Sequence, residues 1–319
     1  MAMSVASVAS GERLKHYGTF GLRRVGQQLF GLRRFRAEVP TNVSVRIERL
    51  RRDQARIEEA LGRPLKGQHL LVVGPGQLLR EARFFGIHNQ VTCLDLDVMP
   101  HGIDPVAYAR MLRTNGLGRV VKTLGRKLLG NDRIEFAEWK RQLGISSLPE
   151  PECQVRDICD GVPSAGHWDV LASFGVFQHI ADLGLALDRC VEALVPGGVL
   201  YIGVQLWTGN TGHHDIRAYT GNEDQLALWG HLRPSQAHEV EPSAWLNKLR
   251  LRDWRALFAK TCPGFTEYQE RYNEAELRAK MTPALREELA DYDDEELYTI
   301  DVFFRWRKPN AGPIRDRPA

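Results

Sequence analysis

Short apolar runs that alternate with helical stretches constrain this chain more than any other feature. The run His69–Val73 is apolar from Leu70 onward and ends in Gly74-Pro75-Gly76, as a strand buried on both faces would. The elements expected after it are a helix over 78–85, a strand over 91–94 that ends at Asp95, a strand over 168–174, a helix over 181–194 and a strand over 199–204. Strands separated by helices imply a parallel sheet with right-handed crossovers, and therefore an α/β fold.

The last expected strand has a different character. Residues 298–307 place Ile300, Val302, Phe304 and Trp306 on one face, and a helical stretch over 283–297 precedes them. A strand reached in this way suits an antiparallel position at the edge of the sheet.

The N-terminal part of the chain is strongly basic. Residues 1–66 hold 14 Lys+Arg against 6 Asp+Glu, a net charge of +8, whereas the remainder holds 29 against 34, a net charge of −5. Residues 21–24 and 31–34 are near-repeats of Gly-Leu-Arg-Arg, Pro40 and Asn42 predict a break, and an amphipathic helix is expected over 43–61. Its expected apolar positions are Val45, Ile47, Leu50, Ile57 and Leu61.

We therefore expect a basic helical extension over 1–66, a main domain over 67–309 with 207–262 on the acceptor side, and a flexible tail over 310–319. The role of the extension stays open between four alternatives. It is a solvated arginine face on packing helices, a lid or homodimer arm over an anionic substrate, a nucleic-acid contact, or a membrane-surface segment over 13–36. Nucleic acid is disfavoured because no recognised nucleic-acid module is present.

Composition excludes several classes of protein. No apolar run approaches the ~18 residues that a membrane span needs, and the opening MAMSVASVAS lacks the basic segment and apolar length of a secretory signal. The five cysteines form an odd, scattered set without a Cys-x-x-Cys pair, which argues against disulfides and zinc knuckles. We expect a cytoplasmic protein.

Three features fall where an open parallel sheet binds ligands, outside the carboxyl ends of its strands. Val73 leads into Gly74-Pro75-Gly76, whose glycines let a ligand approach the backbone. Asp95 ends the second strand, and it or Asp97 is suited to accept both hydroxyls of a ribose. Asp157 precedes the strand at 168 and is suited to meet an adenine amino group.

Together with Ser173–Ile180 and the later Leu194-Val195-Pro196-Gly197-Gly198, these residues resemble the class I S-adenosylmethionine-dependent methyltransferases. The resemblance implies a doubly wound, mostly parallel, seven-stranded Rossmann-like sheet, S-adenosylmethionine as cofactor, and Phe174 among the cofactor contacts. A narrower likeness points to a bacterial branch acting on sugars or secondary metabolites. It rests on Gly212–His214, Trp229–Arg233, Trp245–Arg250, Met281–Leu289, Asp293–Leu297 and Arg307–Pro309.

The chain departs from the class at two positions. Val72 stands where an acidic residue is usual, and Leu78 where a third glycine is expected, so other groups must hold the amino-acid end of the cofactor. The nicotinamide alternative is weaker, because Gly74-x-Gly76-x-x-Leu79 lacks the last glycine of that fingerprint and no Tyr-x-x-x-Lys pair is present.

Histidines are the candidate general bases for methyl transfer to a hydroxyl, since their pKa lies near working pH. His179 follows the strand at 168–174, and His213 and His214 occupy a glycine-flanked loop beyond the next strand. His231 and Arg233 are candidates for binding a carboxylate or phosphate on the acceptor. A metal site at His213, His214 and Asp215 is disfavoured by the spacing, so no metal is expected.

The expected function is methylation of a small-molecule acceptor, at oxygen, in a natural-product or sugar biosynthetic pathway. Two alternatives stay open: methylation of an amine or peptide-derived nitrogen, and a non-catalytic binding subunit that kept the fold. Val72 and Leu78 are the residues that favour the second alternative.

Overall fold

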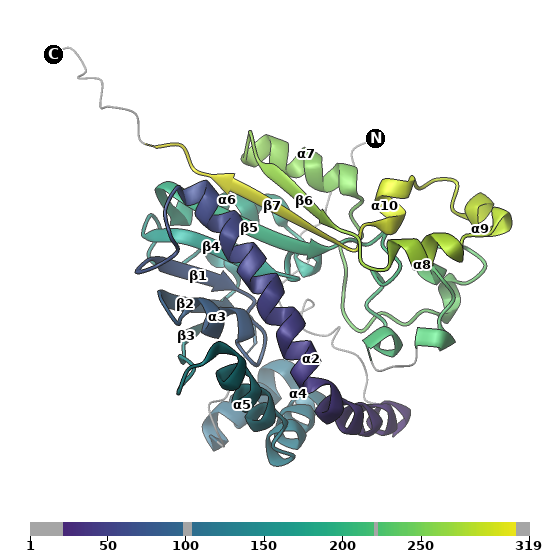
Figure 1. Cartoon of the computed structure of the whole chain (residues 1–319), viewed down its shortest axis with the longest axis horizontal. Helices are drawn as coiled ribbons and strands as arrows, with labels where there is room; N and C mark the ends of the chain where they lie inside the picture. The colour runs from purple at the N-terminus through teal and green to yellow at the C-terminus, as the bar shows by residue number, and fades with distance from the viewer. Residues whose placement is uncertain (1–21, 98–103, 220–222, 311–319) are drawn as a thin grey trace, which may run out of the picture.

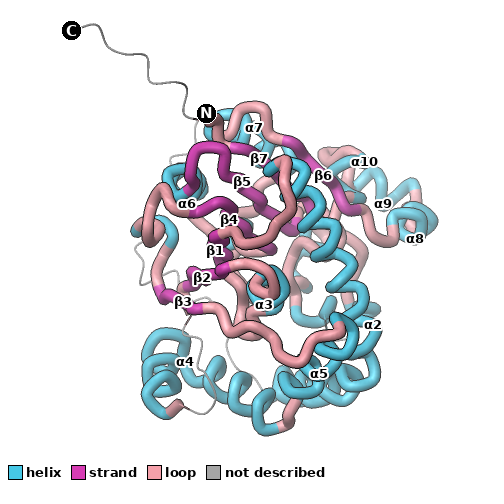
Figure 2. Tube along the Cα trace, turned by 60° about the vertical axis from the view of Figure 1, so that its left-hand side comes forward, coloured by secondary structure: helices cyan, strands magenta, loops and turns pink. Residues whose placement is uncertain are grey.

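The computed structural model describes residues 22–97, 104–219 and 223–310, except the side chains of 22–36, 114, 115, 118, 119 and 122. Residues 1–21 of the predicted extension and 311–319 of the predicted tail lie outside this description. The described chain forms one seven-stranded sheet with helices on both faces (Figures 1 and 2).

The strands are β1 (His69–Val73), β2 (Gln90–Asp95), β3 (Glu152–Val155), β4 (Trp168–Phe174), β5 (Leu194–Gln205), β6 (Thr266–Glu270) and β7 (Asp301–Arg307). Their order in the sheet is β3-β2-β1-β4-β5-β7-β6. β1 to β5 are parallel, and β7 is antiparallel to both β5 and β6. The α/β fold class and the antiparallel direction of β7 are confirmed. The expected edge position is corrected, because β7 lies between β5 and β6 and the edge strand is β6.

The longer helices are α2 (Leu22–Leu61), α4 (Pro105–Leu128), α5 (Asn131–Leu143), α6 (Leu183–Ala193) and α7 (Leu251–Thr261). Short helices are α3 (Arg80–Phe85), α8 (Glu274–Ala279), α9 (Pro283–Glu288) and α10 (Asp294–Tyr298). No element was predicted between Asp95 and Asp157, where the structure has α4, α5 and β3.

Alternation along the strands divides the core into two layers. Leu71, Leu171 and Phe304 pack with α6 and α7, whereas Leu70, Val170 and Phe303 pack with α2 and α5 on the other face. Adjacent residues of one strand therefore face different helices, which is why these strands are apolar throughout.

α2 corrects two sequence-based expectations. The predicted break at Pro40 is wrong: α2 continues through this position. The N-terminal part of α2 takes a different direction from the rest of the helix, as a proline-containing helix often does (Figure 1). The amide of Gln142 on α5 donates to the carbonyl oxygen of Pro40 at 2.8 Å. Val45 is also wrong as a core position: it is 61% exposed, while Val43 takes its place beside Ile47 and Leu50.

The basic charge of α2 is matched by acids on the sheet side. Arg46 pairs with Glu81 at 3.0 Å, Arg49 with Asp301 at 3.3 Å, and Arg56 with Glu270 at 2.9 Å. The opposite net charges of the extension and the main domain therefore meet, at least in part, across this interface. No helix among the described residues is both long and apolar enough to cross a membrane.

Candidate functional site

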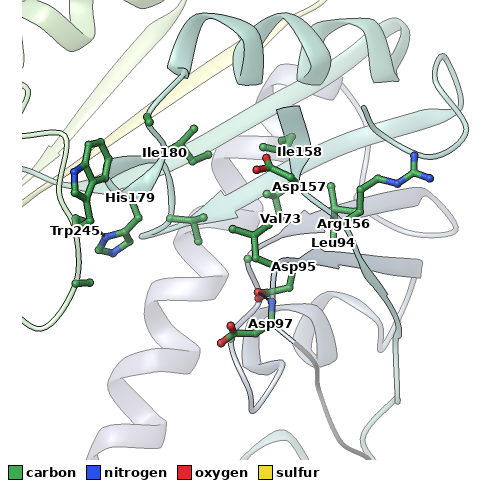
Figure 3. A pocket seen from close by; sticks show the side chains of 16 residues that line it. Val73, Leu94, Asp95, Asp97, Arg156, Asp157, Ile158, His179, Ile180 and Trp245 are labelled. Carbon is green, nitrogen blue, oxygen red and sulfur yellow. Dashed lines mark hydrogen bonds between the residues drawn. The ribbon is translucent and has the colours of Figure 1, made fainter. Parts of the chain in front are cut away.

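The sheet changes winding direction between β1 and β4, whose carboxyl ends are adjacent. A cavity of about 250 Å³ opens there, at the position where α/β sheets bind ligands (Figure 3). Its lining residues are Val73, Gly74, Gly76, Leu94, Asp95, Leu96, Asp97, Arg156, Asp157, Ile158, Val176, His179, Ile180, Ala181, Ala244 and Trp245.

The turn after β1 needs both of its glycines. Gly74 and Gly76 have φ values of +66° and +64°, in the left-handed region that side chains disfavour. A Cβ on Gly74 would lie 2.2 Å from Cγ2 of Val176, so this glycine permits close contact between the β1 and β4 loops. A Cβ on Gly76 would have no protein atom within 4 Å, so backbone at Gly76 is open to a ligand. Leu79 keeps a φ of +51° without being glycine.

Three carboxylates line the same cavity, those of Asp95 and Asp97 at the end of β2 and that of Asp157 after β3 (Figure 3). Asp95 ends β2, and one of its carboxylate oxygens accepts from the backbone N–H of Asp97 at 2.8 Å. Asp157 follows β3 and accepts from the backbone N–H of Cys159 at 2.9 Å. Parallel pairing of β1, β2 and β3 is what brings these sequence-distant acids together.

His179 is held in one tautomer. Its Nδ1 lies 2.8 Å from the carbonyl oxygen of Trp245, which can only accept, so Nδ1 carries the proton and Nε2 keeps a lone pair. Burial lowers the pKa of His179 below its ordinary value, because desolvation disfavours the imidazolium, and the bond to Trp245 offsets part of this effect. The cavity is therefore lined by a neutral imidazole.

The other three candidate histidines lie outside this cavity. His214 contacts His179 edge-on, with ring centroids 5.0 Å apart, and burial lowers its pKa to about 3. His213 lines a second cavity of about 610 Å³, and its Nδ1 accepts from the backbone N–H of Asp215. His231 lies 5.0 Å from the His213 ring, and burial lowers its pKa to about 3. The structure thus brings His214 beside His179 and groups His213 with His231.

Several other predicted site residues are placed elsewhere. Phe174 packs on the opposite face of the sheet, between the rings of Phe85 and Tyr201. Pro75 does not line the cavity, although both neighbouring glycines do. Arg233 forms a paired contact with Glu288, at 3.0 and 2.9 Å.

The Asp215 carboxylate accepts a hydrogen bond from Nη2 of Arg217 at 2.7 Å. Among the residues that the structure describes, no group of three or more His, Cys, Asp or Glu side chains is arranged to hold a metal.

The sequence reasoning missed the far wall of the cavity, formed by Ala244 and Trp245. Asn247 ties this segment to the β4 loop: its side-chain amide donates to the carbonyl oxygen of Phe177 at 2.9 Å, and its backbone N–H to that of Gln178. Arg156 and Ile158 were also missed, although both adjoin Asp157 in sequence. The Trp-Leu-Asn run supplied a signal, but nothing in the sequence tells which element it faces.

No protein-family model matches the chain, and no curated protein matches its sequence. Among solved structures, it is similar to phosphoethanolamine N-methyltransferase 2 of Haemonchus contortus in complex with phosphomonomethylethanolamine and S-adenosylhomocysteine. The identity is 17% and the TM-score 0.43, and the match covers 82% of this chain and 53% of that one. The chain thus spans about half the length of that structure.

It is also similar to an S-adenosylmethionine-dependent methyltransferase from Mesorhizobium loti, with 14% identity, a TM-score of 0.39, and coverage of 76% and 92%. A third similar structure is the geranyl diphosphate C-methyltransferase of Streptomyces coelicolor A3(2), bound to Mg²⁺, geranyl diphosphate and S-adenosylhomocysteine. Here the identity is 16%, the TM-score 0.38, and the coverage 85% and 84%. We assign the fold of this chain from the order of its own strands.

Proposed function

We propose that this protein is an S-adenosylmethionine-dependent methyltransferase that methylates a small-molecule acceptor at oxygen, in a biosynthetic pathway. One observation carries the proposal. A glycine turn, two strand-end carboxylates and a tautomer-locked histidine surround a single cavity at the switch point of the sheet. A cytoplasmic location is part of the proposal, and it is supported by the five cysteines, none of which forms a disulfide in the described structure.

The cavity residues fit the parts of the cofactor. The Asp95 carboxylate is the acceptor that a ribose diol requires, and Leu96 and Ile158 offer apolar surface for an adenine ring. Asp157 adds an acceptor for the adenine amino group, and the open backbone at Gly76 admits a ligand without a side-chain clash. Val72 is fully buried in β1, so the amino-acid end must be held by groups other than an acid at that position.

When bound, the cofactor supplies a methyl group activated by the adjacent positive sulfur. The protein's task is then to hold the acceptor hydroxyl in line and to accept its proton. His179 suits this step, because its pKa is lowered, its Nε2 lone pair is free of the Trp245 bond, and its ring lines the cavity.

Cofactor binding is tested by titrating the protein with S-adenosylhomocysteine in a calorimeter. Asp95→Ala removes two charge-assisted hydrogen bonds to the ribose, together about 3 kcal/mol, so Kd rises about 150-fold. Asp188→Ala, an exposed aspartate on α6, is the matched control and leaves Kd unchanged. If the unaltered protein shows no heat at millimolar ligand, the chain is a non-catalytic subunit and the proposal fails.

Catalysis is tested by incubating the protein with isotopically labelled cofactor and an extract of the source organism, and identifying the labelled product by mass. His179→Asn keeps a donor for the Trp245 carbonyl but loses the basic nitrogen. We expect the turnover of this product to fall about 100- to 10,000-fold, with S-adenosylhomocysteine binding unchanged. Label on nitrogen would contradict the assignment to oxygen, and unchanged turnover would remove His179 as the base.

A further inference from the structure

Two cysteines that lie far apart in the sequence are neighbours in the sheet. Cys93 on β2 is the direct partner of Cys153 on β3 in the parallel register. Both side chains pack in one small apolar cluster with Ala82 of α3. They therefore lie side by side on the same face of the sheet.

This arrangement meets the geometric requirement for a disulfide. Disulfides join cysteines whose Cα atoms are about 4.4–6.8 Å apart, and neighbouring strands of a sheet lie about 4.8 Å apart. The two thiols already interact, because each is hydrogen-bonded to the other. Sγ of Cys153 also lies 3.8 Å from the carbonyl oxygen of Pro151, a contact too long to hold this thiol away from Cys93.

The two thiols differ in access and in acidity. Cys93 is fully buried, whereas Cys153 is half-buried on β3, at the edge of the sheet (Figure 2). The hydrogen bond from Cys93 lowers the pKa of Cys153, and Arg83 acts in the same direction, although burial, Asp95 and Glu152 oppose them. The same hydrogen bond raises the pKa of Cys93. Since the thiolate is the reactive form, Cys153 is the more reactive of the two.

We propose that Cys93 and Cys153 are a site of reversible oxidation, at which a hydroperoxide converts the two thiols to a disulfide between β2 and β3. A half-buried, acidified cysteine beside a second cysteine that can resolve it is the arrangement of a redox-sensitive pair. In a reducing compartment such a disulfide is transient and is opened again by thiols.

The chemistry balances with hydrogen peroxide as the oxidant. The thiolate of Cys153 attacks one peroxide oxygen, the O–O bond breaks, and hydroxide leaves and is protonated to water, which gives a sulfenic acid at Cys153. Sγ of Cys93 then attacks the sulfenic sulfur. The S–S bond forms, the S–O bond breaks, and the hydroxyl leaves as water with the Cys93 proton. Two electrons pass from the two thiols to the peroxide.

The other cysteines do not compete for this partner. Cys190 and Cys262 are fully buried in the layer that packs with α6 and α7. Cys159 packs against that same layer, and its Sγ contacts the carbonyl oxygen of Asp182 at 3.7 Å.

A metal is a weaker interpretation of the pair. Two thiols need at least one further ligand, and no group of three or more His, Cys, Asp or Glu side chains in the described part of the chain could hold an ion. The proposal depends on the strand register, and it stands whether or not the protein transfers methyl groups.

The sequence allows an unambiguous experiment, because trypsin places each of the five cysteines on a different peptide. Cys93 falls in peptide 84–110 and Cys153 in peptide 142–156. The folded, reduced full chain is treated with one equivalent of hydrogen peroxide, its remaining thiols are blocked with iodoacetamide, and it is digested without reductant for mass spectrometry. Free thiols are counted in denaturant before and after oxidation.

We expect the count of free thiols to fall from five to three. Peptides 84–110 and 142–156 should appear joined, two hydrogen atoms lighter than their sum, and dithiothreitol should restore all five thiols. The urea midpoint of the oxidised protein should rise, because the disulfide closes a long loop that contains α4 and α5.

Single variants separate the two roles. In Cys93→Ala no disulfide forms at this site, and oxidation stops at a sulfenic acid on peptide 142–156 that dimedone traps. In Cys153→Ala the buried Cys93 is oxidised at least about tenfold more slowly than Cys153 is in the unaltered protein. Cys159→Ala is the matched control, since Cys159 is also half-buried, and it forms the disulfide at the rate of the unaltered protein.

Several outcomes would overturn the proposal. They are five free thiols after oxidation, a link that joins any other pair of peptides, or a link between two chains, seen as a dimer without reductant. A lower urea midpoint after oxidation would show that the paired strands do not accommodate the bond. The peptide map of the unaltered protein needs no variant, so a variant that fails to fold does not affect the result. Binding of S-adenosylhomocysteine bears on none of these outcomes.

Discussion

Gly74 and Gly76 offer a direct test of how the glycine turn after β1 is built. They share almost the same left-handed φ, +66° and +64°, yet differ in what surrounds them. A Cβ on Gly74 would meet both methyl groups of Val176, at 2.2 and 2.8 Å, whereas a Cβ on Gly76 would meet no protein atom within 4 Å. Alanine at the two positions therefore separates the cost of backbone conformation from the cost of crowding.

The magnitudes follow from these two contributions. A left-handed φ costs an alanine about 1–2 kcal/mol, and this cost is common to both variants. The 2.2 Å contact in Gly74→Ala forces the β1 and β4 loops apart, at a further cost of about 1–3 kcal/mol. We therefore expect Gly76→Ala to lower the free energy of unfolding by about 1–2 kcal/mol, and Gly74→Ala by about 2–5 kcal/mol.

Urea unfolding monitored by circular dichroism measures both variants, without added ligand. Val176→Ala removes the two clashing methyl groups, so it should recover about 1–2 kcal/mol in the Gly74→Ala background while costing stability by itself. Equal losses for the two glycine variants, or no recovery in the double variant, would refute the close contact between the loops. The same variants titrated with S-adenosylhomocysteine would then report whether the cavity tolerates either change.

The remaining predictions concern buried polar groups. His214 and His231, whose pKa is lowered to about 3 in the folded state, bind fewer protons than in the unfolded chain between about pH 3 and 6.5. Stability therefore falls as the pH falls through this window, by about 2 kcal/mol per histidine from pH 7 to 5, and His231→Gln should flatten a urea-midpoint profile. Tyr201→Phe removes a 2.5 Å donor to the buried carboxylate of Asp53 and an acceptor for Arg56, and should cost about 2 kcal/mol at pH 7. Unchanged urea midpoints would contradict either statement.

The sequence was sufficient to predict the elements that a local pattern of apolar residues defines. Each predicted strand in the 69–204 core occurs close to its expected position, because continuous apolar runs ending in glycine or aspartate have few alternatives to a buried parallel strand. The 98–151 region carries no such pattern, and its helices were not foreseen. Pro40 was misjudged because the helix tolerates a proline at an exposed position. The side-chain amide of Gln142 on α5 also contacts the helix there, by donating to the Pro40 carbonyl oxygen.

The candidate site divides in the same way. Gly74, Gly76, Asp95, Asp157 and His179 were identifiable from sequence because each follows a strand, and parallel strands end at the same edge of a sheet. The sequence did not show which histidine faces the cavity. His213 and His214 are adjacent in sequence, yet His213 lines the second cavity and His214 packs against the ring of His179.

The sequence by itself thus determined the α/β class, the location of the glycine turn that lines the cavity, and the opposite charges of residues 1–66 and of the remaining chain. Only the tertiary structure decided that α2 arginines pair with acids of the main domain, that Phe174 belongs to the opposite face, and that the Trp245 carbonyl selects the His179 tautomer. The physical reason is the separation of the interacting residues along the chain. Strand and turn patterns act over a few residues, whereas these contacts join residues 27 to 252 positions apart, for which local sequence carries no signal.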